Sequence, residues 1–317
     1  MSEVSLSDGI TEKGTAPIVS VNMPVYNCAA YLTEAIESIL NQTFQDFELI
    51  ICNDGSTDHS LKIVQSYAAK DSRITVITRE NLGIVATRNE MLAHSRGKFI
   101  AVLDCDDVAL PHRFALQVKY LEEHPDVVCV GGDTRLIDGK GRYLTTLLHI
   151  RGNEAINESA LAGNGAITHS CAMMRSDIMR SVGGYDPDLN LVEDLDMWLR
   201  LGELGKLENI AEPIVNYRLH AKSASELNGL EQRQAAKRAC EAASKRRGIA
   251  CQYNSGELWR PASDADSKHK FMLQYGWWAW INKEYKTAAI YGLKAIKIKV
   301  LNKEGWRLLV CALFKRK

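Results

Sequence analysis

Residues 99–107 read FIAVLDCDD, an apolar run that ends in three closely spaced carboxylates. The run Phe99–Leu103 predicts a buried strand, and the acidic cluster Asp104–Asp107 follows directly at its carboxyl end. The segment FELIICNDGS has the same plan, with the predicted strand Phe47–Cys52 and the polar turn Asn53–Ser56. In an open parallel sheet, ligands bind outside the carboxyl ends of the strands, so both polar groups are expected on one rim.

Strand-like and helix-like segments alternate on either side of these two stretches. Further strands are predicted at Ile18–Met23, Ile74–Thr78 and Asp126–Val130. Helices are predicted at Tyr31–Leu40, Leu61–Ala69 and Ile84–Ala93, with another beginning at Pro111. Pro24 is expected to stop the first strand, and the Asn53–Ser56 turn to cap the helix after it. Strands separated by helices predict an α/β fold, a Rossmann-like, doubly wound, mostly parallel sheet with helices on both faces.

The rest of the chain suggests three regions. Residues 1–16 are polar and are expected to form a flexible leader, and residues 17–222 to form the sheet domain. Within that domain a further helix is predicted at Leu195–Leu204, beyond an irregular stretch that contains the Gly131-Gly132 pair. Residues 223–317 are rich in Ala, Lys, Arg and Trp, and predict a helical C-terminal appendage.

Composition limits the classes of function. Lys+Arg and Asp+Glu both number 39, so the net charge is zero and no nucleic-acid partner is indicated. Eight cysteines form no CxxC pair, which favours a reducing compartment over a disulfide framework. No signal peptide and no bilayer-spanning apolar run is recognised, so a cytoplasmic location is expected.

Three groups of carboxylates are candidates for chemistry. The oxygen ligands of Asp104–Asp107 suit Mg²⁺ or Mn²⁺ with a bound diphosphate, although an acidic turn before a helix would look the same. Asp54 could accept a hydrogen bond from a nucleobase N–H or a ribose hydroxyl, or simply form its turn. Glu193-Asp194 could take a proton from an attacking hydroxyl, or act only as charges at a helix N-terminus.

Taken together, these residues resemble glycosyltransferase family 2, inverting enzymes with the GT-A fold. The resemblance spans roughly residues 17–222 and rests on seven segments in the family's order. They are VSVNMPVYN at 19–27, NDGSTD at 53–58, NLG at 81–83 with Arg88-Asn89, LDCDD at 103–107, GGYD at 183–186, ED at 193–194 with WLR at 198–200, and YRLH at 217–220. Cys105 is a departure, because the family more usually has a small polar residue or Ala between the aspartates.

The resemblance implies a role for each matched residue. Pro24, Tyr26, Asp54 and Arg88 would hold the nucleotide. Asp104 and either Asp106 or Asp107 would serve the ribose and a Mn²⁺ or Mg²⁺ ion, with His220 as a further metal ligand. Asp194 would be the general base, supported by Glu193. His169, Trp198 and Arg200 would line the donor and acceptor pocket.

The implied reaction is transfer of a single sugar from a nucleotide sugar, most simply a UDP-sugar, to a hydroxyl of a glycan or lipid-linked acceptor. Bacterial surface-polysaccharide assembly is the expected setting. Two alternatives stay open at this point: a non-catalytic protein that binds nucleotide sugars, and a sugar nucleotidyltransferase. A processive synthase is disfavoured, because the chain has no membrane helix pattern and no Gln-x-x-Arg-Trp motif.

The C-terminal third carries a separate pattern. From Lys286 to Lys317 there are nine Lys or Arg residues and a single acid, Glu304. The basic, Trp-bearing segment Gly305–Lys317 is typical of a helix that lies on an anionic membrane surface. The tryptophans of Phe271–Ile281 are instead expected to include core residues.

Overall fold

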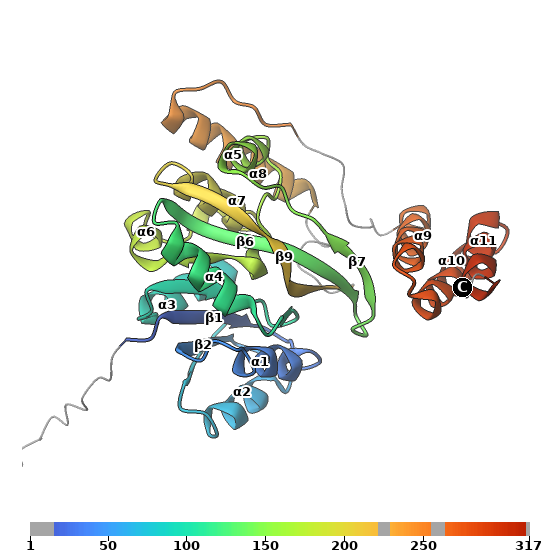
Figure 1. The fold of residues 1–317 in the computed structure, drawn as a ribbon, viewed down its shortest axis with the longest axis horizontal. Helices are drawn as coiled ribbons and strands as arrows, with labels where there is room; N and C mark the ends of the chain where they lie inside the picture. The colour runs from blue at the N-terminus through green and yellow to red at the C-terminus, as the bar shows by residue number, and fades with distance from the viewer. Residues whose placement is uncertain (1–15, 221–228, 255–263, 315–317) are drawn as a thin grey trace, which may run out of the picture.

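The computed structural model describes residues 16–220, 229–254 and 264–314. Within these residues nine strands form one sheet, in the spatial order β3-β2-β1-β4-β8-β6-β9-β5, with β7 beside β6. The long strands β6 and β9 run side by side in Figure 1. The strands are β1 (Val19–Val25), β2 (Phe47–Asp54), β3 (Ile74–Arg79), β4 (Phe99–Val102), β5 (Val108–Ala109), β6 (Val127–Asp138), β7 (Tyr143–Leu147), β8 (Met173–Arg175) and β9 (Lys206–Leu219).

Helices cover the sheet and continue beyond it. Those up to β9 are α1 (Leu32–Leu40), α2 (Ser60–Ala68), α3 (Ile84–His94), α4 (Arg113–Glu123), α5 (Asn153–Leu161), α6 (Ser176–Ser181) and α7 (Glu193–Leu201). Those after it are α8 (Gly229–Arg247), α9 (Ala265–Ile281), α10 (Tyr285–Ile298) and α11 (Lys303–Phe314). Two short 3₁₀ turns lie at His169–Cys171 and Pro187–Leu189.

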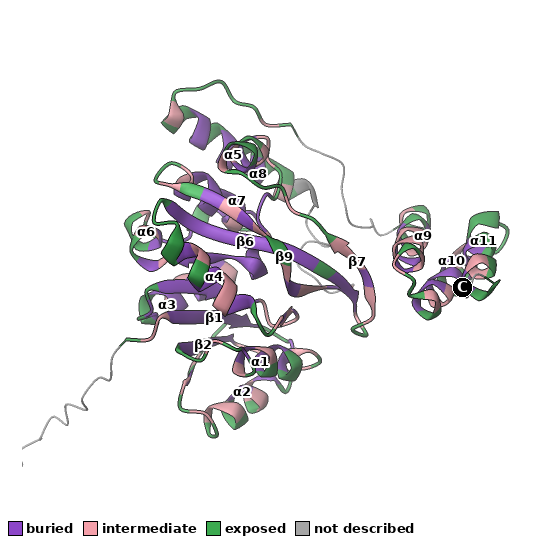
Figure 2. Ribbon diagram, viewed as in Figure 1, coloured by how far each residue is buried: buried purple, intermediate pink, exposed green. Residues whose placement is uncertain are grey.

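The strands β3, β2, β1 and β4 are parallel neighbours. Every residue of β1 and β2 is buried, as expected of strands with helices on both faces (Figure 2). Leu49 and Ile51 pack in one core with α1, α2 and α4, whereas Ile50 and Cys52 contact Met91 of α3 on the opposite face. The predicted doubly wound α/β fold is confirmed.

Pro24 lies inside β1, so the prediction that it stops this strand is wrong. The pairing of β1 with β2 continues to Val25, whereas its pairing with β4 ends at Asn22, whose carbonyl accepts a hydrogen bond from Leu103 N at 3.1 Å. Backbone groups two residues apart face the same neighbouring strand. The N–H that Pro24 lacks would therefore face the side on which the ladder to β4 has already ended.

The second half of the sheet is mixed in direction. β8 is antiparallel to both β4 and β6, and β9 is parallel to β6. The strand predicted at Asp126–Val130 is much longer than expected, because β6 runs through the glycine pair. A Cβ on Gly131 would meet the Asn209 side chain of β9, and one on Gly132 would meet Ile214 at 2.8 Å. The glycines thus allow β9 to approach closely and do not interrupt the strand.

The C-terminal helices pack in two places. α8 shares a core with α5 and α7, built largely from its alanines. α9, α10 and α11 form a separate cluster with Leu136, Leu144 and Leu219, beside β7 in Figure 1. The tryptophans of α9, which were expected to include core residues, are only partly buried against this cluster. Within the described residues no helix is both long and apolar enough to cross a bilayer. The predicted boundary near residue 222, and all but the last residue of the predicted leader, fall outside the described residues.

Candidate functional site

At the rim of the sheet, where its parallel strands have their carboxyl ends, side chains join the loop after β1 to the loop after β2. Asn27 has a φ of 51°, and its Oδ1 accepts hydrogen bonds from Thr57 N at 2.8 Å and Asp58 N at 3.3 Å. Its own N–H donates to Ser56 Oγ at 3.0 Å. Tyr26, the preceding residue, keeps 54% of its surface exposed. The two loops therefore hold one another and leave an aromatic ring open on this rim.

Asp54, the last residue of β2, is buried and held by three donors. Its Oδ1 accepts from Leu82 N at 3.0 Å and from Arg79 Nε at 3.2 Å. Its Oδ2 accepts from Gly83 N at 2.9 Å, in the turn that begins α3. Both carboxylate oxygens are thus committed to fixing the start of α3.

The prediction that the Asn53–Ser56 turn caps α2 is consequently wrong. Asn53 belongs to β2, and the N-terminal residue of α2 is bonded by Asp58 instead, whose Oδ1 accepts from Ser60 N at 2.9 Å. The Asp58 Oδ2 also accepts from Ala29 N at 3.0 Å. Those bonds lower the pKa of Asp58 although partial burial opposes them.

A cavity of about 460 Å³ opens between the ends of β2 and β3. Its lining includes Asn53, Gly55, Ser56, Thr78, Arg79 and Asn81. Asn53 Nδ2 donates to Thr78 Oγ1 at 3.0 Å, whereas the buried Oδ1 of the same amide has no hydrogen-bond partner among the described residues. Since an unpaired buried acceptor costs roughly 1–3 kcal/mol, a ligand N–H at this oxygen would be favourable.

The three aspartates after β4 point in different directions. Asp104 Oδ1 accepts from Arg88 Nη2 at 3.3 Å, and its backbone N–H donates to Ser170 Oγ at 3.2 Å. Asp106 Oδ2 lies 2.8 Å from His220 Nε2. Asp107 is buried, and its Oδ1 accepts from the backbone N–H of Arg218 in β9 at 2.8 Å. Burial and the neighbouring aspartates raise the pKa of Asp107 well above its usual value.

These contacts bear on the expected metal. Asp106 and His220 converge on the rim with side chains 25% and 13% exposed, whereas Asp107 is turned toward β9 and fits a metal ligand poorly. In the part of the chain that the structure describes, no three His, Cys, Asp or Glu side chains gather into a metal site. One carboxylate and one imidazole, with the oxygens of a bound diphosphate, still fit Mg²⁺ or Mn²⁺, which commonly use few protein ligands at such sites.

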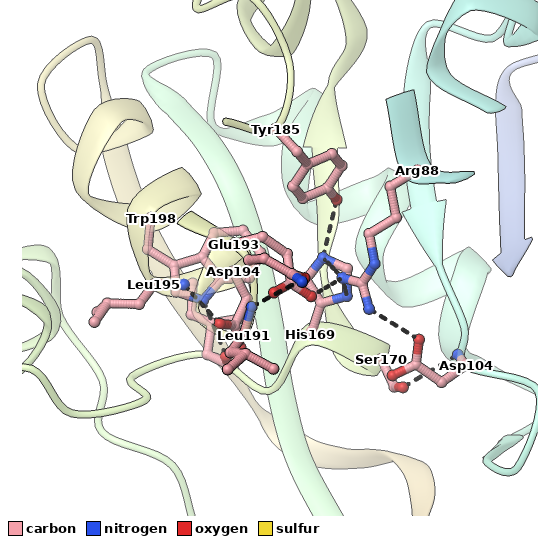
Figure 3. A network of polar contacts seen from close by, with 12 residues as sticks. Arg88, Asp104, His169, Ser170, Tyr185, Leu191, Glu193, Asp194, Leu195 and Trp198 are labelled. Carbon is pink, nitrogen blue, oxygen red and sulfur yellow. Dashed lines mark hydrogen bonds and ion pairs between the residues drawn. The ribbon is translucent and has the colours of Figure 1, made fainter. Parts of the chain in front are cut away.

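Arg88 lies at the centre of a buried polar network (Figure 3). Besides Asp104, its guanidinium reaches Glu193 Oε1 at 3.6 Å and donates to the His169 ring, with 2.7 Å to Nε2. The Tyr185 hydroxyl lies 2.9 Å from the same ring nitrogen. Burial and the Arg88 charge lower the pKa of His169 well below its usual value, so the imidazole is neutral. His169 is therefore a buried partner of Arg88 rather than an open pocket residue.

Asp194 occupies the first turn of α7, next to this network (Figure 3). Its Oδ1 accepts from Leu195 N at 2.7 Å. Burial and the adjacent charge of Glu193 raise the pKa of Asp194 to about 6, although the Leu195 N–H and Arg88 oppose the shift. A carboxylate with this pKa is ionised at neutral pH and is a stronger base than an ordinary aspartate.

Trp198 and Arg200 were predicted to line the pocket, but the structure places both in packing roles. The Trp198 side chain is fully buried, and its Nε1 donates to Ile167 O at 3.2 Å. Arg200 is paired with Asp196 at 2.5 Å and donates to Val182 O at 2.8 Å. They hold α7 in place beneath the site and present no free polar group to a substrate.

Other residues of the site carried no assigned role at the level of sequence. Asn89 and Tyr185 exchange two hydrogen bonds of 2.8 Å, from Asn89 Nδ2 to Tyr185 O and from Tyr185 N to Asn89 Oδ1. Gly184 makes this approach possible, because a Cβ there would meet Asn89 Oδ1 at 2.6 Å. Tyr185 belongs to a quoted segment, GGYD, yet nothing local to it indicated that its hydroxyl would reach His169.

The sequence of this chain is similar to that of a known family and of several known proteins. The family model described as glycosyl transferase family 2 matches residues 20–183. The putative glycosyltransferase EpsE of Bacillus subtilis is 37% identical over 196 residues, which cover 60% of this chain and 69% of that protein. The O-antigen biosynthesis glycosyltransferase WbnJ of Escherichia coli is 34% identical over 210 residues, 65% of this chain and 81% of that one. The chondroitin synthase of Escherichia coli is 32% identical, but its match covers only 30% of that protein.

Solved structures share the fold at low sequence identity. Staphylococcus aureus TarS 1–349 in complex with UDP-GlcNAc has a TM-score of 0.56 and 17% identity, with 93% of this chain and 79% of that chain covered. The mannosyltransferase PcManGT of Pyrobaculum calidifontis, in complex with GDP-Man and Mn²⁺, has a TM-score of 0.54 and 16% identity, with 95% and 88% covered. The expected GT-A-like topology is confirmed.

Proposed function

This chain belongs to glycosyl transferase family 2, and from that premise we propose that it transfers one sugar from a UDP-sugar to a hydroxyl of a glycan or lipid-linked acceptor, with inversion. A single observation carries the proposal: the buried Arg88 contacts both Asp104, beside the expected diphosphate, and Glu193, beside the expected base Asp194. Groups suited to the donor and to proton removal therefore lie in one network. Family membership removes the nucleotidyltransferase alternative.

The proposed donor site is the cavity at the ends of β2 and β3. The unpaired Oδ1 of Asn53 would accept the imide N–H of uracil, and the exposed ring of Tyr26 would stack on a flat face. Pro24 would restrict the backbone two residues before Tyr26, at the end of β1. Asp54 would act indirectly on the donor site, because it holds Arg79 and the turn before α3 in place. The TarS structure holds a UDP-sugar in a similar fold, which supports the choice of UDP.

The proposed metal ligands are Asp106 and His220. Bound there, Mn²⁺ or Mg²⁺ would neutralise charge on the diphosphate and make it a better leaving group. Arg88 would hold Asp104 toward the donor while keeping Glu193 next to Asp194. Asp194 would accept the proton of the acceptor hydroxyl as its oxygen attacks the anomeric carbon from the face opposite the departing nucleotide. A single displacement of this kind inverts the configuration.

The proposed setting is bacterial surface-polysaccharide synthesis, in the cytoplasm at the inner face of the membrane. Support comes from the relative whose name assigns it to O-antigen biosynthesis. The described cysteines are all free, and most are buried, which suits a reducing compartment.

The proposal is tested by a binding and hydrolysis screen of UDP-, GDP- and dTDP-sugars, with and without Mn²⁺. Metal-dependent binding of UDP-sugars is expected, with binding lost in Asp106→Ala and turnover alone lost in Asp194→Ala. The exposed Asp188→Ala is the matched control and is expected to behave as wild type. If no nucleotide sugar bound under any metal condition, the proposed donor site would be wrong, whereas binding without turnover in wild type would favour the non-catalytic alternative.

A further inference from the structure

The last helix, α11, has apolar side chains on two sides. Its inner side is formed by Gly305, Leu308 and Ala312, which are buried against α9 and α10. The other side carries exposed apolar residues at spacings of four and three, which places them along one face. They are Trp306 (49% exposed), Val310 (51%), Leu313 (53%) and, at the margin, Phe314 (82%).

The turn before α11 extends this apolar surface. Val300 and Leu301 are 61% and 94% exposed. The indole Nε1 of Trp306 donates to Val300 O at 2.9 Å, so the ring is fixed against the turn. We call Val300, Leu301, Trp306, Val310, Leu313 and Phe314 the outer face. Single exposed apolar residues are ordinary, but a contiguous group of this kind marks an interaction surface.

The charges around the outer face are almost all of one sign. Lys303 and Arg307 lie one helical turn apart beside it, and Lys297 and Lys299 lie on the adjoining end of α10 and the turn after it. The nearby acids are Glu304, 3.6 Å from Arg307, and Asp266, 2.5 Å from Lys299. Among the described residues neither Lys297 nor Lys303 makes an ion pair. Basic charge thus exceeds acidic charge.

We propose that the outer face docks on an anionic lipid membrane. An exposed Trp among aliphatic side chains, flanked by Lys and Arg, fits a headgroup layer in which apolar groups insert and cations meet lipid phosphates. A second copy of this chain fits less well, since a symmetric contact would bring the same basic side chains, Lys303 and Arg307, from both copies into one interface. The inference rests on the proposed location at a membrane and is independent of the proposed chemistry.

The fold gives this docking a consequence for the reaction. α9–α11 pack against Leu219, the last residue of β9, which directly precedes His220. The Tyr291 hydroxyl of α10 donates to Asp138 Oδ2 at 3.0 Å, at the carboxyl end of β6. The docking helices are therefore attached at the rim that carries the candidate site. A membrane held by the outer face would lie near the rim at which a lipid-linked acceptor is used.

The test is co-sedimentation of the full chain with vesicles of phosphatidylcholine alone or of equal parts phosphatidylcholine and phosphatidylglycerol. Binding is expected only to the anionic vesicles and should fall as salt rises. The triple variant Val310→Ser, Leu313→Ser, Phe314→Ser and the double variant Lys303→Glu, Arg307→Glu should each bind at least about tenfold more weakly. The matched control, Leu148→Ser with Leu204→Ser, changes residues that are 70% and 54% exposed elsewhere and should bind as wild type.

Sugar transfer to a water-soluble acceptor, measured on the same proteins, should be unchanged in every variant. Unchanged transfer shows that the variants fold. It also separates a loss of membrane docking from a loss of the proposed catalytic function. The proposal is overturned if wild type does not bind anionic vesicles at low salt, or binds neutral ones equally well. It is also overturned if sedimentation velocity shows a dimer that the triple variant abolishes.

Discussion

Arg88 Nη1 lies 3.6 Å from Oε1 of Glu193, and both side chains are buried. The two residues come from α3 and from the first turn of α7, so the contact ties the parallel half of the sheet to the segment that carries Asp194. A buried cation without its partners is costly, and here it has Asp104 as well as Glu193. We therefore regard Arg88 as a positioning residue that acts through the carboxylates on either side of it.

Replacing Arg88 by Gln should change the pH dependence as well as the rate. The positive charge lowers the pKa of Asp194, so its removal should move the acidic limb of the kcat profile to higher pH. Arg88→Lys keeps the charge but loses the forked geometry, so its kcat should fall without that upward movement. Profiles of the two variants, with urea unfolding to record stability, distinguish the outcomes. If the acidic limb of the kcat profile did not move in Arg88→Gln, the positioning role assigned to Arg88 would be contradicted.

Asp194→Asn should reduce kcat by about 10²–10⁴-fold, the usual contribution of a general base, with little change in donor affinity. In wild type the base is active when ionised, so kcat should fall as pH drops below about 6, the pKa of Asp194. Rates with a saturating acceptor and calorimetric binding of the donor measure the two effects. The exposed Asp188→Asn serves as control. Equal losses in kcat and in donor binding would place Asp194 in the donor site instead.

The same substitution should affect stability in a pH-dependent way. Folding raises the pKa of Asp194 from 3.8 to about 6, so its contribution to stability is full below about pH 4 and is lost as pH rises through 6. A neutral Asn avoids that loss. The variant should be more stable than wild type at about pH 8 by up to roughly 3 kcal/mol, at about 1.4 kcal/mol per pKa unit, and no more stable near pH 4. Urea unfolding at both pH values measures the difference, and equal gains at both would rule out the ionisation of Asp194 as its cause.

Sequence periodicity predicted the parallel half of the fold well, because strand-like segments there alternate with helix-like segments along the chain. It also placed the aspartates and the Asn53–Ser56 turn on one rim, which follows from strand direction alone. It failed at β6, where the reason for Gly131 and Gly132 lies in side chains of β9, far along the chain. The contact between Arg88 and Glu193 has the same origin, since no local pattern records which distant segments meet.

Trp198 shows a different kind of failure. Leu195, Trp198, Leu199 and Leu201 recur at helical spacing in the sequence, and this spacing alone places the indole on the apolar side of α7. A residue on the apolar side of an amphipathic helix is first of all a core residue. The resemblance to a family drew attention to the WLR segment as a site, whereas the helical pattern gave the better indication of where its first residue lies.

Substitutions of Asp106 and Asp107 should show which of these two aspartates binds the metal. Asp106→Asn and His220→Ala should raise the Mn²⁺ concentration needed for half-maximal binding of UDP by about tenfold or more, while uridine binding is unchanged. Asp107→Asn should leave the metal dependence unaltered, since Asp107 Oδ1 accepts the Arg218 N–H and an amide oxygen does the same. Titrations of each variant with Mn²⁺ measure this. A metal dependence that changed in Asp107→Asn but not in Asp106→Asn would reverse the assignment.

The proposed hydrogen bond from the uracil imide N–H to Asn53 Oδ1 can be tested by changing the protein, the ligand, and both together. Asn53 Oδ1 is buried and unpaired, whereas both oxygens of Asp54 are already held by Arg79, Leu82 and Gly83. If Asn53 Oδ1 accepts the uracil imide N–H, Asn53→Leu and methylation of that nitrogen in UDP should each weaken binding by about three- to tenfold. Combined, they should cost little more than either alone, because both remove the same hydrogen bond. Calorimetry on the four combinations gives the coupling, and losses that simply add would show that the imide group bonds elsewhere.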